Sequence, residues 1–449
     1  MAGTHIVVHY HELWLKGRNR DFFLHKLRLG IKRALEGLEV TRITQPGDRM
    51  VIELAPEADS TAALTRLERV SGISSFGIAR AVDWRAAAGS AAEKNAAASA
   101  SKDELLSPIR DAAWEEIRSE KFATFAVRAK RSYKGFPVNA MAIEREVGGY
   151  LFDKLRAEGR EIRVRLNHPE LTCRIEVTPG PALIYARRHP GAGGLPANTA
   201  GRLICLLSGG FDSAVAAFKM MKRGAHVSFV HFWGGGARAG ESSVHVAREL
   251  VKRLVPWEFT TKLYLVPFEP LQREIVRRAP EKFRILLYRR LMLRIAERVA
   301  GMDQAKGLIT GDSLGQVASQ TIQNMAAVGA ATKLPIYRPL VGDDKLEILE
   351  IARKIGTHDI SAEPFHDCCP MFLPKAPALF ASPEELDEAE ASLGVEELVE
   401  RGIESLTLER YHYAEGIAEQ VESFLPVTAK RSTSRVTPTG SASTRKATA

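Results

Sequence analysis

The stretch that most constrains the fold runs from Leu206 to Val215 and reads Leu-Leu-Ser-Gly-Gly-Phe-Asp-Ser-Ala-Val. It overlaps an apolar run, Leu203 to Leu207, that predicts a buried strand, and it leads into a helical pattern from Ala214 to Arg223. A strand, a glycine turn and a helix N-terminus in this order point several backbone N–H groups and the positive helix end at one place. The stretch therefore predicts a phosphate-binding loop.

The details of this loop decide which class of phosphate site it is. A Walker A loop needs a lysine directly after its second glycine, and here no lysine occurs before Lys219. The pattern Ser-Gly-Gly-x-Asp-Ser after a strand instead resembles the loop of the N-type ATP pyrophosphatases, which cleave ATP between the α- and β-phosphates. Asp212 is then a candidate to bind Mg²⁺ or to orient the pyrophosphate. The alternative is a tight strand–helix connection in which Asp212 or Ser213 only caps the helix.

Length and composition set the broad class of protein. A chain of 449 residues exceeds the size of one hydrophobic core, so several domains are expected. With no signal-peptide core and no run of about 18 apolar residues, the sequence predicts a cytoplasmic protein without a membrane span. The four cysteines form no Cys-x-x-Cys pair, which predicts neither a disulfide framework nor a structural metal. A net charge of +9 favours a nucleic-acid partner, although five of these positive charges lie after Val427.

Regular alternation of strand and helix patterns continues from the glycine loop to Thr310. Such alternation predicts an α/β fold with a doubly wound parallel sheet and a ligand at the carboxyl ends of its strands. Three loops should therefore face the nucleotide: residues 206–213, 231–236 and 311–320.

The N-terminal part reads as small α+β modules that carry two groups of basic residues. Lys16 and Arg18 flank a glycine, and a second group is interleaved with Tyr133 and Phe136, which suits binding of phosphates and stacking on bases. The second group is Arg128, Lys130 and Arg131. The alternatives are a solvated helix start and an ordinary charged loop. Residues 85–103 read as a flexible Ala/Ser/Gly insertion, and residues 191–196 as a linker.

Several stretches together resemble the tRNA 4-thiouridine synthetase (tRNA sulfurtransferase) family. They are the glycine loop, the Tyr288-Arg289-Arg290 helix, the segment from Thr310 to Thr321, the linker Gly193-Gly194-Leu195-Pro196 and the N-terminal Leu15 to Arg20. The resemblance covers about residues 5–415. It implies a ferredoxin-like domain at 1–60, a THUMP RNA-binding domain at 61–180, an ATP pyrophosphatase (PP-loop) domain at 181–425 and a disordered basic tail at 426–449.

The resemblance also implies an ATP site. It would consist of Leu206, Leu207, Ser208, Gly209, Gly210, Asp212, Ser213, His231, Phe232, Arg289, Gly311 and Gln320. Lys345 matches a lysine that the family places near the triphosphate, where its charge would stabilise the departing pyrophosphate. For Arg289 and Gln320 the alternatives are a cation and a polar residue on helix surfaces.

A cysteine segment from Phe365 to Pro370 matches the family's cysteine segment, with Cys368 in the aligned position and Cys369 as a resolving partner. Sulfur transfer needs a thiolate, which the nearby His366 and Lys375 favour. Many members of the family carry a C-terminal rhodanese domain, for which we expect no room here. Direct handover of sulfur to Cys368 is then the simplest hypothesis. A role in thiamine thiazole synthesis is left open.

The activity that the resemblance implies is ATP-dependent sulfur transfer to tRNA. The enzyme would adenylate uridine 8 and replace its O4 with persulfide sulfur to give 4-thiouridine. ATP and Mg²⁺ would be its cofactors, and tRNA and a cysteine desulfurase its partners, with dimerisation left open and no protein-bound metal cluster. The alternatives are an ATP pyrophosphatase with another substrate and a non-catalytic RNA-binding protein. Pyrophosphate release only when tRNA is added would separate the three.

Overall fold

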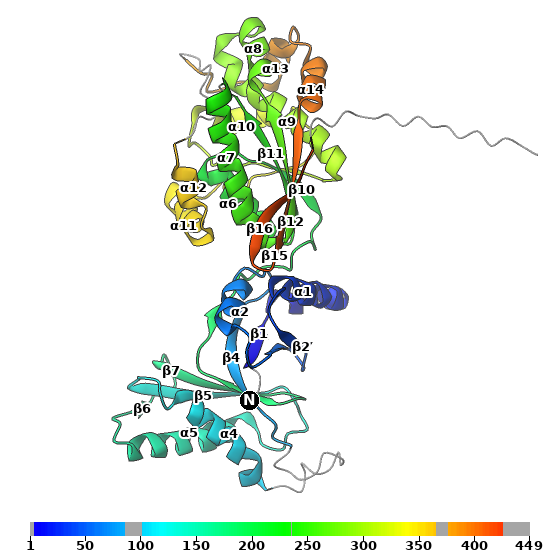
Figure 1. Cartoon of the computed structure of the whole chain (residues 1–449). Helices are drawn as coiled ribbons and strands as arrows, with labels where there is room; N and C mark the ends of the chain where they lie inside the picture. Colours follow the sequence, from blue (N-terminus) through cyan, green and yellow to red (C-terminus); the bar gives the residue numbers. More distant parts are fainter. Residues whose placement is uncertain (1–3, 86–100, 235, 365–375, 425–449) are drawn as a thin grey trace, which may run out of the picture.

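The computed structural model describes residues 4–85, 101–234, 236–364 and 376–424. Two sheets lie end to end in an elongated molecule (Figure 1). A nine-stranded sheet carries the N-terminal part, and a seven-stranded sheet carries the part that contains the glycine loop. Within the described residues, no helix combines the length and the apolar character needed to cross a membrane.

The first part of the chain folds in the order β-α-β-β-α-β. Its antiparallel strands lie in the order β2-β3-β1-β4, the ferredoxin-like arrangement. Its elements are β1 Thr4–His9, the 3₁₀ segment η1 Glu12–Asn19, α1 Arg20–Ala34, β2 Val40–Thr44, β3 Met50–Leu54, α2 Ser60–Leu67 and β4 Ser75–Val82. Apolar residues at helical spacing put Leu24, Leu27 and Ile31 of α1 against the sheet. Asp59 caps α2 by accepting a hydrogen bond from the Ala62 N–H.

The second part extends the same sheet with four paired strands in the order β4-β8-β7-β5-β6. Its elements are α4 Lys102–Ile117, β5 Thr124–Arg131, α5 Ala140–Ala157, β6 Arg163–Val164, β7 Leu171–Val177, β8 Ala182–Tyr185 and β9 His189–Pro190. Both helices pack their apolar faces into one buried core with β5 and β7. Because β4 pairs with both β1 and β8, the sheet sets no boundary between the two N-terminal domains, and the limits given above stay predictions.

The third part has the predicted doubly wound parallel sheet. Five parallel strands lie in the order β14-β13-β10-β11-β12, with β10 in the middle, so the chain reverses direction across the sheet between β10 and β13. Its elements are β10 Arg202–Leu206, α6 Phe211–Lys222, β11 His226–Trp233, α7 Gly236–Leu254, β12 Thr260–Pro267, α8 Glu269–Arg278, α9 Arg284–Asp303, β13 Leu308–Ile309, α10 Ile322–Gly329, β14 Ile336–Tyr337, α11 Lys345–Ile355, α12 His358–Ala362, α13 Pro383–Glu390 and α14 Val395–Glu404. Ligands of such sheets bind at this point of reversal.

Alternation along the strands produces two cores, one on each face of this sheet. Cys205 of β10 and Leu207, which follows the strand, face α6, α7 and α11. Ile204 of β10 faces α9 on the other side of the sheet. The first of these cores continues without a break into α1 and α2 of the first domain. The two halves of the molecule therefore share packed apolar side chains.

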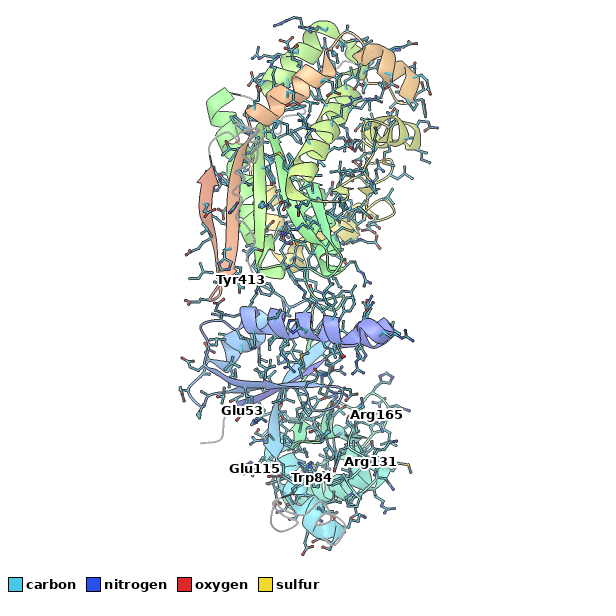
Figure 2. The ribbon with its side chains drawn as sticks, turned by 90° about the vertical axis from the view of Figure 1, so that its right-hand side faces the viewer. Glu53, Trp84, Glu115, Arg131, Arg165 and Tyr413 are labelled. Atoms are coloured by element: carbon cyan, nitrogen blue, oxygen red, sulfur yellow. The ribbon has the colours of Figure 1, made fainter. Side chains whose placement is uncertain are left out.

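A hairpin of two antiparallel strands, β15 Thr407–Ala414 and β16 Ile417–Phe424, was not predicted from the sequence. It adds to the β12 edge of the parallel sheet. Buried Tyr411 and Tyr413 alternate with exposed Arg410 and His412, a period-two pattern that was available in the sequence. The labelled Tyr413 lies where the hairpin meets the first domain (Figure 2).

The predicted linker is held rigidly between the two halves. The Gly193 N–H donates to the Ile73 carbonyl oxygen at 2.7 Å, and the Leu195 N–H donates to the Lys222 carbonyl oxygen at 3.0 Å. Gly194 has φ +72°, and a Cβ there would lie 2.0 Å from the Lys222 oxygen. This glycine is required because the linker passes directly over the C-terminal end of α6.

Replacing Gly194 with alanine should therefore cost more than replacing an unconfined glycine. Gly201 is the matched control, because its φ is +94° and a Cβ there meets nothing within 4 Å. We expect Gly201→Ala to lower the free energy of unfolding by about 1–2 kcal/mol through backbone strain. Gly194→Ala should lower it by roughly 1 kcal/mol more, because the new Cβ would break the hydrogen bond from the Leu195 N–H to the Lys222 carbonyl oxygen. Thermal unfolding measures both. Equal losses would contradict the confined geometry.

Candidate functional site

The glycine loop closes through its own serines and leaves the start of α6 open. The Ser208 N–H donates to the Ser213 Oγ at 3.1 Å, and the Gly210 N–H donates to the Ser208 Oγ at 3.3 Å. Gly210 is the N-cap of α6, and no side chain in the described part of the chain caps the helix. The first-turn N–H groups are thus free to bind an anion at the positive end of the helix.

Gly311 lies directly against this first helical turn. A Cβ on Gly311 would be 2.7 Å from the Ser213 nitrogen and 2.8 Å from the Asp212 carbonyl carbon. Only glycine permits this contact between the backbone after β13 and the backbone of α6. The contact places Gly311 and the glycine loop together where the sheet order reverses.

Asp212 and Lys345 meet at the mouth of the loop, as an ATP site there requires. The Lys345 Nζ lies 2.6 Å from one Asp212 carboxylate oxygen, and the Gln316 side-chain amide donates to the other at 3.2 Å. Lys345 is the first residue of α11, which Asp344 and Glu347 hold in place with a capping box. The lysine is half-exposed, so its charge faces both the loop and solvent.

Asp312 organises the other wall and was not among the predicted site residues. It is 4% exposed and accepts hydrogen bonds from four side chains: Arg289, Thr310, Arg338 and Gln320. Burial by itself raises the pKa of this carboxyl, but the Arg289 charge, the Thr310 hydrogen bond and the Arg338 charge outweigh it and lower the pKa. Asp312 is therefore a buried anion that fixes Arg289 and Gln320 in the wall.

Two predicted residues of this wall, Arg289 and Gln320, have different roles. The Arg289 guanidinium also donates to the Ser319 carbonyl oxygen at 3.1 Å, so it holds the loop that follows β13. The Gln320 Oε1 is buried and has no hydrogen-bond partner among the residues that the structure describes. An unsatisfied buried oxygen in this wall is suited to accept a hydrogen bond from a ligand.

The side chains of His231 and Phe232 belong to the core. The His231 ring nitrogens lie 2.8 Å from the Leu207 carbonyl oxygen and from the Ser243 Oγ, and the Phe232 ring packs edge-on against Phe268. The backbone of Phe232, in contrast, faces the loop. The Val230 carbonyl oxygen accepts a hydrogen bond from the Leu207 N–H, so the backbone groups of Val230 point toward β10. Because backbone groups alternate along a strand, those of Phe232 point to the same side, where β10 has already ended. Phe232 can thus offer backbone groups beside the loop.

Cys368 and Cys369 lie outside the described residues. Of the cysteines within them, Cys173 and Cys205 are both buried, and desolvation raises the pKa of the Cys173 thiol to about 12 and also raises that of Cys205. Neither is suited to act as a thiolate. The described residues contain no cluster of three or more His, Cys, Asp or Glu able to hold a metal ion.

The predicted RNA-binding residues fall into separate places. Arg128 and Lys130 line a cavity of about 350 Å³ between the two N-terminal domains. Arg131 donates to the Phe136 carbonyl oxygen in the second of these domains (Figure 2). Lys16 and Arg18 lie on η1, where the Lys16 Nζ sits 4.9 Å from the centre of the Phe23 ring. The structure brings only Arg128 and Lys130 to a common cavity.

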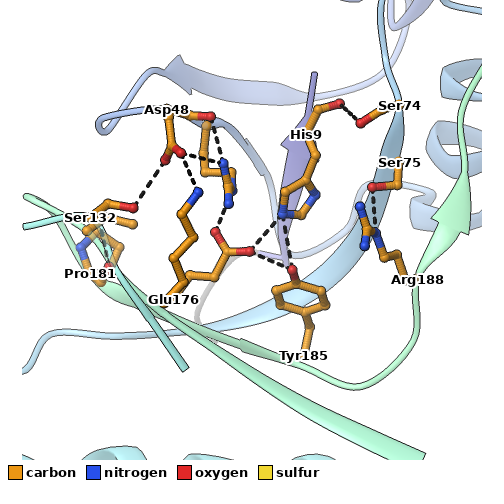
Figure 3. Close-up of polar contacts among 12 residues, drawn as sticks. His9, Asp48, Ser74, Ser75, Ser132, Glu176, Pro181, Tyr185 and Arg188 are labelled. Carbon is orange, nitrogen blue, oxygen red and sulfur yellow. Dashed lines mark hydrogen bonds and ion pairs between the residues drawn. The ribbon is translucent and has the colours of Figure 1, made fainter. Parts of the chain in front are cut away.

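A buried polar network lies at the base of this cavity (Figure 3). Glu176 of β7 contacts His9 of β1 at 2.7 Å, the Tyr185 hydroxyl at 2.6 Å and the Arg49 Nε at 2.5 Å. Burial tends to raise the pKa of Glu176, but hydrogen bonding and charge from His9, and the Arg49 charge, lower it to about 2. The network joins the first domain to the second. Its members are far apart in sequence and form no local motif, which is why sequence analysis missed them.

The comparisons with known proteins agree with this geometry. Residues 198–395 match the family described as thiamine biosynthesis protein (ThiI), residues 5–77 match the ThiI ferredoxin-like domain, and residues 99–187 match the THUMP domain. A probable tRNA sulfurtransferase of Thermus thermophilus is 40% identical over 390 residues, which cover 87% of this chain and 89% of the relative. One of Moorella thermoacetica is 37% identical over 405 residues, or 90% of this chain and 97% of the relative.

A solved structure of a 4-thiouridine synthetase–RNA complex with bound ATP matches with a TM-score of 0.78 and 30% identity, over 91% of this chain and 99% of that chain. The fold and the loop define an ATP pyrophosphatase domain joined to ferredoxin-like and THUMP domains. The chain belongs to the tRNA sulfurtransferase family.

Replacing Glu176 with glutamine should destabilise the N-terminal domains in a pH-dependent way. Since the folded-state pKa lies near 2 and the usual value is 4.5, the carboxylate contributes about 3 kcal/mol at pH 7. That contribution is complete above about pH 4.5 and is lost as the pH falls toward 2. Urea unfolding from pH 7 to pH 3 should show the variant and the wild type converging.

The control is Glu146→Gln, which removes an exposed carboxylate paired with Lys102 in the second domain. Exposed pairs contribute little, so this variant should match the wild type throughout. A Glu176 variant whose deficit stays constant down to pH 3 would show that the carboxylate charge is not what stabilises the network.

Proposed function

We propose that this chain is the enzyme that adenylates uridine 8 of tRNA with ATP and replaces its O4 with sulfur, giving 4-thiouridine. The observation that carries the proposal is the uncapped N-terminus of α6 with Asp212 and Lys345 paired at its mouth, where the parallel sheet reverses its order. A triphosphate needs backbone donors and a nearby cation. Membership of the tRNA sulfurtransferase family, and a relative solved with RNA and ATP, support the same activity.

The residues around the loop fit ATP. The backbone N–H groups in the first turn of α6 would hold phosphate oxygens, and Lys345 would balance the charge of the leaving pyrophosphate. Asp212 supplies carboxylate oxygens, the ligands that a Mg²⁺ ion accompanying the triphosphate prefers. The Phe232 backbone and the Gln320 Oε1 are the groups available to the rest of the nucleotide.

The proposed chemistry has two steps at the uridine, followed by release of the product from the protein. Uridine O4 attacks the α-phosphorus of ATP and pyrophosphate leaves, which makes O4 part of a good leaving group. The terminal sulfur of a persulfide on Cys368 then attacks C4, and AMP leaves with O4. The Cys369 thiol attacks the Cys368 sulfur, which frees the thiouridine sulfur and leaves a disulfide that a cellular dithiol reduces. His358 lies ten residues before Cys368 in the sequence, and its ring is 5.3 Å from that of Phe211 at the start of α6. The described chain that precedes the cysteine segment therefore passes close to the site.

The partners follow from this chemistry. A cysteine desulfurase would supply the persulfide sulfur, and the ferredoxin-like and THUMP domains would hold tRNA through Arg128, Lys130 and Arg131, with Lys16 and Arg18 as a second contact. The substrates and the sulfur donor place the enzyme in the cytoplasm.

Lys345→Ala should reduce tRNA-dependent pyrophosphate release by about 10²–10³-fold, because the variant loses the cation that stabilises the leaving group. Lys333→Ala is the control, since Lys333 is also exposed but lies before β14 and away from the loop. Release of labelled pyrophosphate with and without a tRNA transcript measures the effect. A wild-type enzyme that releases pyrophosphate equally without tRNA would overturn the proposed substrate.

Cys368→Ser should abolish 4-thiouridine formation and leave tRNA binding and pyrophosphate release intact, because only the second step needs the thiol. Cys369→Ser should stall after the first turnover, with sulfur left bound to Cys368. Nucleoside mass analysis of the tRNA product measures both. Normal thiolation by the Cys368 variant would exclude its assigned role.

A further inference from the structure

A second positively charged cavity, of about 470 Å³, lies between the first domain and the nucleotide domain. Four helices end at it: α2, α6, α7 and α11. Each contributes basic residues from its last turn or just beyond, and Glu68 is the single acidic residue among the described residues that line the cavity. The basic residues are Arg69, Lys219, Lys222, Arg253, Arg353 and Lys354.

Most of these charges are uncompensated. Lys219 forms an ion pair with Asp343, but the other five basic residues make no ion pair with any residue that the structure describes. Cations at helix C-termini do stabilise the helices, since each end carries roughly half a negative charge. The four helix ends together carry about two negative charges, and Glu68 adds one more. Set against the five unpaired basic residues, this leaves about two positive charges without compensation. Helix capping alone does not require this excess.

The position of the cavity ties it to the phosphate loop. Helices α6 and α11 begin at the loop, with Phe211 and Lys345, and both end at the cavity, with Lys222 and Ile355. They pack against each other, and at 1.5 Å per residue they span about 16–18 Å. Another wall is the linker at residues 190–192, whose Gly191 N–H donates to the Ser74 oxygen at 3.0 Å. The cations are thus held at a fixed distance from the loop.

The cavity also offers aromatic surface. Trp257 is half-buried in its wall, and its ring packs edge-on against Phe218 with centroids 4.8 Å apart. Fixed cations beside an aromatic side chain are the combination that binds a nucleic-acid backbone with unpaired bases. An acidic protein could also bind the cations. It would not explain, as RNA does, why they lie between the RNA-holding domains and the loop.

We propose that this cavity binds backbone phosphates of the RNA substrate, between the part held by the N-terminal domains and the uridine at the glycine loop. This inference rests on the proposed function for the identity of the RNA. It assigns a phosphate-binding role to Arg69, Lys222, Arg253, Arg353 and Lys354. The cavity then acts as a spacer contact, since phosphate contacts set register without reading bases.

The test compares two double variants of the full chain with equal charge change. Arg69→Ala with Lys354→Ala removes one cation from each side of the cavity. Lys306→Ala with Lys333→Ala removes two exposed lysines that have no ion pair in the described part of the chain and lie outside the cavity. Binding of an unmodified tRNA transcript is measured from 50 to 300 mM salt, together with ATP affinity and melting temperature.

Losing two phosphate contacts should lower the slope of log affinity against log salt by about 1.4–1.8 in the cavity variant, with several-fold weaker binding near 0.15 M salt. ATP affinity should match that of the control, and the melting temperature should fall by no more than a few degrees, because each removed cation also balances the negative end of a helix. An unchanged slope in the cavity variant, or an equal change in the control, would overturn the proposal, even if the wild type thiolates tRNA. A wild type that never thiolates tRNA, with the slope change still present, would overturn the proposed function and leave an RNA-binding cavity.

Discussion

Close backbone packing at the two ends of α6 is the constraint on which the rest of the molecule depends. At the N-terminal end, Gly311 lies against Ser213, and at the C-terminal end Gly194 lies against the Lys222 oxygen. Neither contact tolerates a side chain, so the helix is fixed between the strand that carries the wall of the nucleotide site and the linker that carries the N-terminal domains. A shift at either end would move the glycine loop relative to the N-terminal domains.

The two ion pairs beside the loop have different consequences. Asp312 is buried and bound by two arginines, and breaking such an arrangement costs several kcal/mol, on the order of 3–5. Asp312 therefore has a structural role. The pair between Asp212 and Lys345 is half-exposed, and exposed pairs contribute about 0–1 kcal/mol. A phosphate group could therefore replace Asp212 as the partner of Lys345 at little cost in free energy. The Asp212 carboxylate would then be available to bind a cation.

What could be predicted from the sequence was local. The strand, the glycine loop and α6 are contiguous, so residues 203–223 carried their own pattern, and the parallel sheet followed from alternation. The Arg and His partners of Asp312 and Glu176 lie 23 to 167 residues away, which no periodicity reveals. His231 was placed beside the nucleotide by resemblance, but its ring is bound to Leu207 and Ser243 because β11 is buried on both faces.

The rigid linker bears on how one uridine would be chosen. Phosphate contacts fix register and carry no sequence information. If the RNA is held in the N-terminal cavity and again at the C-terminal end of α6, the protein fixes two points on the RNA backbone. It also fixes the distance from the second point to the loop, about 18 Å along the helix. The target is then the uridine that the shape of the folded RNA presents at that distance, and selection by geometry needs no base-specific pocket in the N-terminal domains.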